Sequence, residues 1–75
     1  MNAKQKIGKI IKDERIRQGL SLSQLADKTW SDIRRQNHIS AIEKGNRNFT
    51  IDVLVEIFLA LELDFKEFII DKTKK

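Results

Sequence analysis

The sequence predicts a small all-α domain, on three observations. The 75-residue chain has no proline and only three glycines, at positions 8, 19 and 45, so long segments lack helix breakers. Apolar residues recur three and four positions apart, which is the spacing of one helix face. β-Branched residues fall within these helical stretches rather than in runs of their own. We expect one domain over residues 1–75, with a core at about 4–70 and a frayed basic tail at 71–75.

Two helices are expected in the first half of the chain. The first covers residues 4–18 and stops at Gly19, because glycine readily adopts the left-handed conformation that ends many helices. Ser21 and Gln24 have the spacing of a capping box, which predicts a second helix over about residues 22–29. The connection is very short, so the two helices should pack tightly at an angle.

The second half of the chain predicts three more helices. A third helix should end near Lys44, with Gly45 as its stop. Thr50 can cap a fourth helix over about residues 51–61. A last short helix is expected at about 65–70. The apolar face of the fourth helix has helical spacing and consists of Leu54, Ile57, Phe58 and Leu61.

Positive charge is concentrated in the first two thirds of the chain. Residues 1–19 hold six Lys/Arg against two acidic residues, and residues 20–50 hold five against three. Residues 51–75 hold four against six, which leaves the net charge at +4. This asymmetry favours a polyanionic partner, and a merely solvated basic surface is the alternative.

Several classes of function find no support in the sequence. Without cysteine, and with His38 as the single histidine, we expect no metal site. No catalytic combination and no glycine-rich phosphate loop is recognisable, so we expect neither an enzyme nor a cofactor or small-molecule ligand. No signal peptide and no run of about 20 apolar residues is present, so a cytoplasmic protein without a membrane partner is expected.

Residues 39–50 form the most specific motif, Ile-Ser-x-Ile-Glu-x-Gly-x-Arg-x-x-Thr. Over about residues 7–70 the chain resembles the phage-repressor and Cro-type (XRE-like) helix-turn-helix family. Its other matching residues, in family order, are Ile7, Gly8, Arg15, Gly19, Leu20, Ser21, Leu25, Ala26 and Leu54. The resemblance implies a compact five-helix lambda-repressor-like fold and a DNA-binding transcriptional regulator, either repressor or activator. Asn-Arg-Asn-Phe-Thr and the small size look like the controller proteins of restriction–modification systems, although phage and chromosomal regulators share these features.

The resemblance also implies roles for individual side chains. The third helix would lie in the major groove of double-stranded DNA, where Asn and Gln suit adenine and Arg suits guanine. The base-contact candidates are Arg34, Arg35, Gln36, Asn37, His38 and Ala41. The phosphate-contact candidates are Ser23, Gln24, Lys28, Ser40, Lys44, Asn46, Arg47 and Asn48. Glu43 resembles the family glutamate that forms a structural ion pair with an arginine of the first helix, here Arg15.

Plainer interpretations exist for some of these candidates. Arg34 and Arg35 can be an ordinary solvated pair, and His38 an ordinary surface residue. Residues 46–48 can be only a turn, because Asn tolerates unusual backbone angles.

The segment between the second and third helices departs from the family. Twelve residues separate Ala26 and Ile39, where the family has about nine, and the usual turn glycine is absent. Either the turn is longer, or the third helix begins nearly one turn earlier with Ser31 as its cap. Trp30 or Ile33 would then fill the gap that an aliphatic residue normally fills. Trp30 is expected in the core, with stacking at a DNA strand end as the alternative.

The last third of the chain carries more apolar residues than so small a core needs. We interpret the excess as part of a homodimer interface, with Val55, Leu59, Phe65, Ile69 and Ile70 as candidates. A homodimer would place two third helices in successive major grooves about 34 Å apart, on a near-palindromic operator. The alternative is a protein-interaction module, antitoxin-like or a scaffold, whose apolar stripe binds another protein.

Overall fold

A computed structural model describes residues 2–63, and all regular elements in that range are helical. The elements are α1 (Ala3–Arg17), α2 (Leu22–Trp30), the 3-10 helix η1 (Ile33–Arg35), α3 (Gln36–Glu43) and α4 (Ile51–Ala60). The all-α prediction is confirmed, with four α-helices in the described part of the chain. The predicted fifth helix at 65–70 and the tail at 71–75 lie outside the described residues.

Local hydrogen bonds fix the first two helices. Asn2 caps α1, and its side chain and that of Gln5 form a capping box that the sequence analysis missed. Gly19, with φ of 72°, ends α1 as predicted. The predicted capping box of α2 is present: Gln24 N–H donates to Ser21 Oγ over 3.0 Å, and Ser21 N–H donates to Gln24 Oε1 over 2.7 Å.

The junction of α3 and α4 also follows its sequence signals. Gly45 has φ of 74°, and Asn46 N–H donates to the Ala41 carbonyl over 3.0 Å, so α3 ends in a left-handed cap. Thr50 caps α4, since its Oγ1 accepts a hydrogen bond of 3.2 Å from Val53 N–H. The polar loop between the two helices therefore has a fixed start and a fixed end.

The junction of α2 and α3 is a longer turn, the first of the two alternatives. Ser31 ends α2 in the left-handed conformation, with φ of 56°, and does not cap the third helix. Asp32 caps η1 instead, because its Oδ1 accepts from Arg34 N–H over 3.0 Å. Of the two residues expected to fill the gap, Trp30 packs against the core, whereas Ile33 is 57% exposed. A 3-10 turn thus precedes α3.

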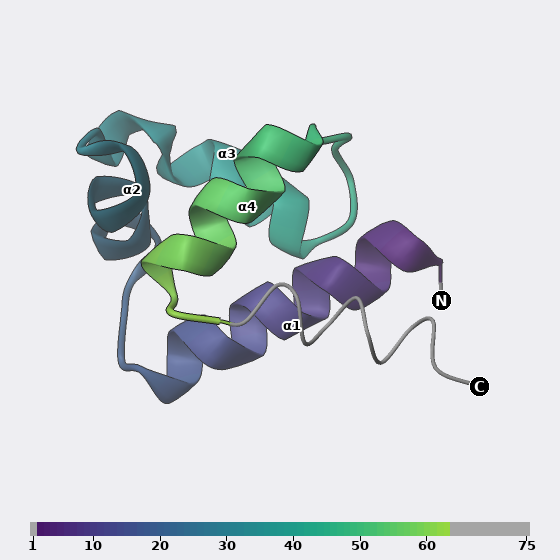
Figure 1. Cartoon of the computed structure of the whole chain (residues 1–75), viewed down its shortest axis with the longest axis horizontal. Helices are drawn as coiled ribbons and strands as arrows, with labels where there is room; N and C mark the ends of the chain where they lie inside the picture. The colour runs from purple at the N-terminus through teal and green to yellow at the C-terminus, as the bar shows by residue number, and fades with distance from the viewer. Residues whose placement is uncertain (1, 64–75) are drawn as a thin grey trace.

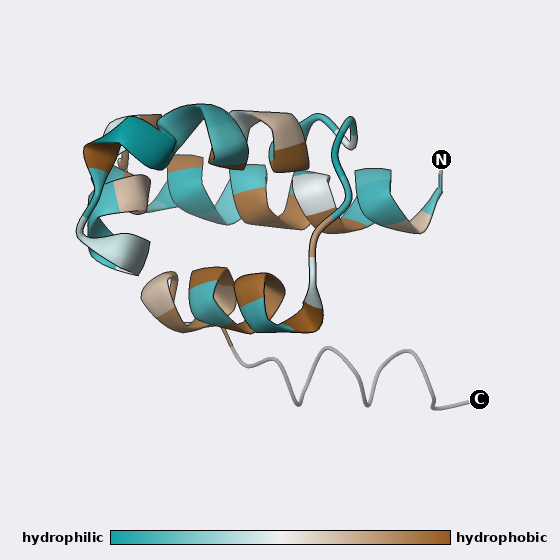
Figure 2. Cartoon of the chain, turned by 90° about the horizontal axis from the view of Figure 1, so that it is seen from above, coloured by the Kyte–Doolittle hydropathy of each residue, from teal (hydrophilic) through white to brown (hydrophobic). Residues whose placement is uncertain are grey.

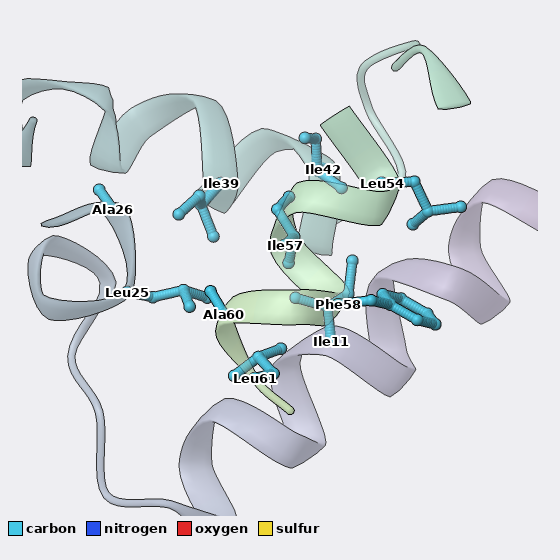
Figure 3. Close-up of a cluster of buried hydrophobic side chains, with 10 residues drawn as sticks. All are labelled: Ile11, Leu25, Ala26, Ile39, Ile42, Leu54, Ile57, Phe58, Ala60 and Leu61. Atoms are coloured by element: carbon cyan, nitrogen blue, oxygen red, sulfur yellow. The ribbon is translucent and has the colours of Figure 1, made fainter. Parts of the chain in front are cut away.

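The core lies between the four helices, and within residues 2–63 it contains ten buried apolar side chains (Figure 3). The complete predicted face of α4 is buried, with Ile57 and Phe58 at its centre. Ile39 and Ile42 are fully buried and attach α3 to this core. The other buried residues are Ile11, Leu25, Ala26, Leu54, Ala60 and Leu61.

Two layers can be seen when the views are compared. α4 lies on one side, with α1 and α3 on the other, while α2 contacts both α3 and α4 (Figures 1 and 2). Hydrophobic colour dominates α4, whereas α1 and α3 are largely hydrophilic (Figure 2). The hydrophilic helix α3 and the most apolar helix, α4, therefore lie in different layers.

Two contacts hold α3 against α1. Gly8 brings the helices close, because a Cβ at this position would lie 2.5 Å from the Glu43 carbonyl oxygen. Arg15 pairs with the Glu43 carboxylate through two hydrogen bonds, Nε–Oε2 at 2.7 Å and Nη2–Oε1 at 3.1 Å. Arg15 Nη1 also donates to the Leu20 carbonyl over 2.8 Å. These contacts fix the carboxyl end of α3 against α1. The face of α3 that is not buried in the core is left for contacts outside the domain.

Candidate nucleic-acid interface

Three of the base-contact candidates are exposed, one in η1 and two in the first turn of α3. Arg34 is 88% exposed and its Nε donates to Asp32 Oδ1 over 3.0 Å. Gln36 and Asn37 are exposed in the first turn of α3, and no hydrogen bond within residues 2–63 engages their side-chain amides. Both amides are thus available to a binding partner. The Nε and Nη2 donors of Arg34 become available only when its pair with the Asp32 carboxylate is broken.

Arg35 and His38 are held in a different way, by stacking on Trp30. The Arg35 Cζ lies 3.8 Å from the centroid of the Trp30 ring. The His38 ring is stacked on Trp30 with centroids 5.6 Å apart and an interplanar angle of 21°. Trp30 Nε1 donates to Glu56 Oε1 of α4 over 2.7 Å. We call these four residues, Trp30, Arg35, His38 and Glu56, the tryptophan cluster.

The electrostatic surroundings of His38 are positive. Burial lowers the pKa of His38 below its ordinary 6.5, and the charges of Arg47 and Arg35 lower it further. The imidazole is therefore mainly neutral at pH 7, so it can accept as well as donate a hydrogen bond.

The phosphate-contact candidates of α2 already have partners within the protein. Gln24 is part of the α2 capping box, and Ser23 Oγ lies 3.2 Å from Ser21 Oγ. Lys28 Nζ lies 3.9 Å from a carboxylate oxygen of Glu62. A contact between these side chains and DNA would compete with these local interactions.

The candidates beyond α3 are more accessible. Lys44, Asn46 and Arg47 are exposed at the end of the helix and in the loop that follows. Asn48 is exposed too, but its Oδ1 accepts a hydrogen bond of 3.0 Å from Lys4 Nζ of α1. The remaining candidates, Ser40 and Ala41, are half-buried between the two ends of α3. Exposed polar groups thus flank α3 at both of its ends.

Three contacts at this surface were missed in the sequence analysis. The Asp32–Arg34 pair had a signal, because an Asp before a short helix is a common cap. The contacts of Lys4 with Asn48 and of Glu56 with Trp30 had none, since 44 and 26 residues separate their partners. Only the fold brings such groups together.

No group of three or more His, Cys, Asp or Glu side chains within residues 2–63 could hold a metal ion. In the same part of the chain, no helix combines the length and the apolar character needed to cross a membrane.

Two helices joined by a turn, the second of them with exposed polar and basic groups, are the arrangement found in helix-turn-helix proteins. The family model described as helix-turn-helix matches residues 11–68, and the chain belongs to this family, in its Cro/XRE type. Membership points to a DNA-binding regulator. Comparisons with curated proteins and with solved structures gave no match.

Proposed function

We propose that the protein is a sequence-specific transcriptional regulator that binds double-stranded DNA as a homodimer, in the cytoplasm. The observation that supports this most directly is the orientation of α3. Ile39 and Ile42 are fully buried, while Gln36, Asn37 and Arg47 are exposed at its two ends. A helix anchored on one face with free amides and a cation beyond it suits insertion into a major groove.

Base reading is assigned to the start of α3 in this proposal. Gln36 and Asn37 can each offer one donor and one acceptor to adenine, and Arg34 can offer two donors to guanine. Lys44, Asn46 and Arg47 are assigned to phosphates, which position the domain but carry no sequence information. In the free protein Arg34 is paired with Asp32. This ion pair has to break when Arg34 contacts a base.

Dimer formation is assigned to the outer face of α4. Leu59 is 68% exposed, Ile51 is 66% exposed, and half-buried Val55 lies between them at a spacing of four residues. The other candidates, Phe65, Ile69 and Ile70, lie outside the described residues. Pairing two small modules doubles the DNA contacts, so occupancy of a near-palindromic operator should rise steeply with protein concentration.

A more specific role and an alternative function both stay predictions. A role as controller protein of a restriction–modification system rests on Asn46–Thr50 and the small size alone. A protein-interaction module is the second candidate function, because the apolar row on α4 could equally contact another protein.

The first experiment is selection of binding sites from a random DNA duplex library by the purified protein at moderate salt. An enriched inverted repeat is expected, because each subunit of a symmetric dimer reads one half-site. Weak, salt-sensitive binding without enrichment would instead favour the protein-interaction module.

Substitution of Asn37 and of Arg47 tests the division between base and phosphate contacts. Asn37→Ala should relax preference at one base position by about 1–3 kcal/mol, because a bidentate contact is lost. Arg47→Ala should weaken binding to all sequences alike and reduce the salt slope by about one. Both quantities come from competition binding at several salt concentrations. Unchanged binding in both variants would refute the assigned roles.

A further inference from the structure

The tryptophan cluster joins α4 to the face on which bases would be read. We propose that Trp30 is a positioning residue that orients Arg35 and His38 for base recognition, and that Glu56 of α4 holds Trp30 in place. The inference rests on the proposed function, since it assigns a specificity-determining role within it.

Stacking on Trp30 orients Arg35 and itself uses none of the hydrogen-bond donors of the guanidinium. The Cζ–centroid distance of 3.8 Å places the guanidinium in contact with the indole ring. Guanidinium donors lie in the plane of the group, whereas the ring contacts its face. Apart from Nη2, which lies 3.5 Å from His38 Nδ1, the donors of Arg35 therefore remain available for a base or a phosphate, and the contact with the indole limits the directions in which they point.

His38 is oriented by the same ring. It is stacked on Trp30 and its Nδ1 lies 3.5 Å from Arg35 Nη2, so the two candidates and the indole form one contiguous group. A shift of the indole would move both side chains together. Neither Arg35 nor His38 can be expected to read a base with a defined geometry unless Trp30 is itself fixed.

Trp30 is held in place by a residue of α4, a helix that carries none of the base-contact candidates. Its Nε1 donates to Glu56 Oε1 over 2.7 Å, and the indole packs against the core on another side. Glu56 is exposed on α4 and has no part in the buried apolar face of that helix. The hydrogen bond therefore ties the indole edge to α4 without involving the buried apolar face of that helix.

The experiment compares Glu56→Ala with Glu56→Gln. Both variants lose the same negative charge, so any change in non-specific attraction to DNA is matched between them. Only glutamine keeps an oxygen that can accept from Trp30 Nε1. Trp30→Phe is the third variant, since it keeps an aromatic ring under Arg35 but lacks the donor. Far-ultraviolet circular dichroism and thermal unfolding establish that each variant is folded.

Discrimination between the selected operator and its single-base variants is the main readout. Glu56→Ala and Trp30→Phe should lose about three- to tenfold in discrimination at the base pair read by Arg35 or His38, which corresponds to one net hydrogen bond. Other base pairs and the salt slope should be unchanged. Glu56→Gln should retain the wild-type profile.

A second readout needs no DNA. Trp30 is the only tryptophan, so its fluorescence emission reports this cluster alone. Emission of the free protein should shift to longer wavelength in Glu56→Ala, as the indole becomes more hydrated, and should stay at the wild-type position in Glu56→Gln.

The opposite outcomes are distinct. Equal base profiles in Glu56→Ala and Glu56→Gln, or an equal loss at all base pairs, would overturn the positioning role even if Trp30→Phe is unfolded. Failure of the wild-type protein to enrich any operator would be a failure of the proposed function, and the emission comparison would still decide whether Glu56 holds the indole.

Discussion

Ser31 occupies a backbone position that favours glycine. Its φ of 56° lies in the left-handed region, which costs a residue with a Cβ about 1–2 kcal/mol. Glycine takes the same conformation after α1 and α3, at Gly19 and Gly45, whereas Glu62 after α4 has φ of 60° and, like Ser31, carries a Cβ. The backbone is therefore strained at Ser31, where α2 ends and the connection to α3 begins.

Replacement of Ser31 should relieve this strain. Ser31→Gly is expected to raise the free energy of unfolding by about 0.5–1 kcal/mol, because part of the gain is offset by the greater freedom of glycine in the unfolded chain. Ser31→Ala is the matched control, since it also removes the hydroxyl but keeps the Cβ. Urea unfolding measures both, and equal stability of the two variants would contradict the argument.

At the scale of the elements, α3 depends on α1 for its position. The carboxyl end of α3 meets Gly8 at a distance that leaves no room for a side chain. The Arg15–Glu43 pair lies beside it, with side chains only 12% and 5% exposed. A nearly buried pair is sensitive to the loss of one partner, because the other charge then remains without compensation.

Arg15→Met should therefore be strongly destabilising. We expect a loss of about 3 kcal/mol in the free energy of unfolding, since Glu43 stays buried without a partner. Lys9→Met is the control, because the Lys9–Asp13 pair on the same helix is 62% and 61% exposed. Its loss should cost less than about 1 kcal/mol, as for surface pairs. Urea unfolding curves with similar losses for both variants would show that burial does not govern the pair.

The elements differ in how far the sequence predicts them. The stops at Gly19 and Gly45 and the caps at Ser21 and Thr50 were predictable, because a cap is formed by residues within one turn. The left-handed Ser31 was not predictable, since its conformation follows from the connection between α2 and η1 rather than from its own preference.

The candidate site was predictable in composition but not in arrangement. The resemblance gave the candidates around α3, and several of them, among them Gln36, Asn37 and Arg47, are exposed. The sequence offered no sign that Arg35 and His38 stack on Trp30, because that contact depends on the 3-10 turn and on Glu56 of another helix. Residues far apart in the chain are joined only by the tertiary fold.

At the scale of the whole molecule, α4 serves two surfaces. Its inner face supplies Leu54, Ile57 and Phe58 to the core, and its outer face exposes Leu59. The two layers therefore differ in polarity, since hydrophobic colour dominates α4 and hydrophilic colour dominates α3 (Figure 2). This asymmetry suits a dimer that pairs through one layer and contacts DNA with the other.

Leu59→Asp should produce a folded monomer. Leu59 is 68% exposed, so a charge there leaves the core intact, but a charge buried between subunits without a partner is costly. Ile16→Asp is the matched control, since Ile16 is 56% exposed on α1, and this variant should stay dimeric. Analytical ultracentrifugation over a concentration series gives the mass of each. A wild-type protein that is monomeric at every concentration would refute the dimer.

The shared core has a consequence for turnover of the protein. Ile39 and Ile42 of α3 are buried with residues of the other three helices, so α3 cannot detach while the core stays closed. Cleavage within α3 by a protease should therefore require global unfolding, at a rate set by the unfolded fraction. Since so small a domain has only a few kcal/mol of stability, a loss of about 1–2 kcal/mol can lower its abundance several-fold. Substitutions far from α3 would then alter the amount of protein in the cell without touching its polar surface.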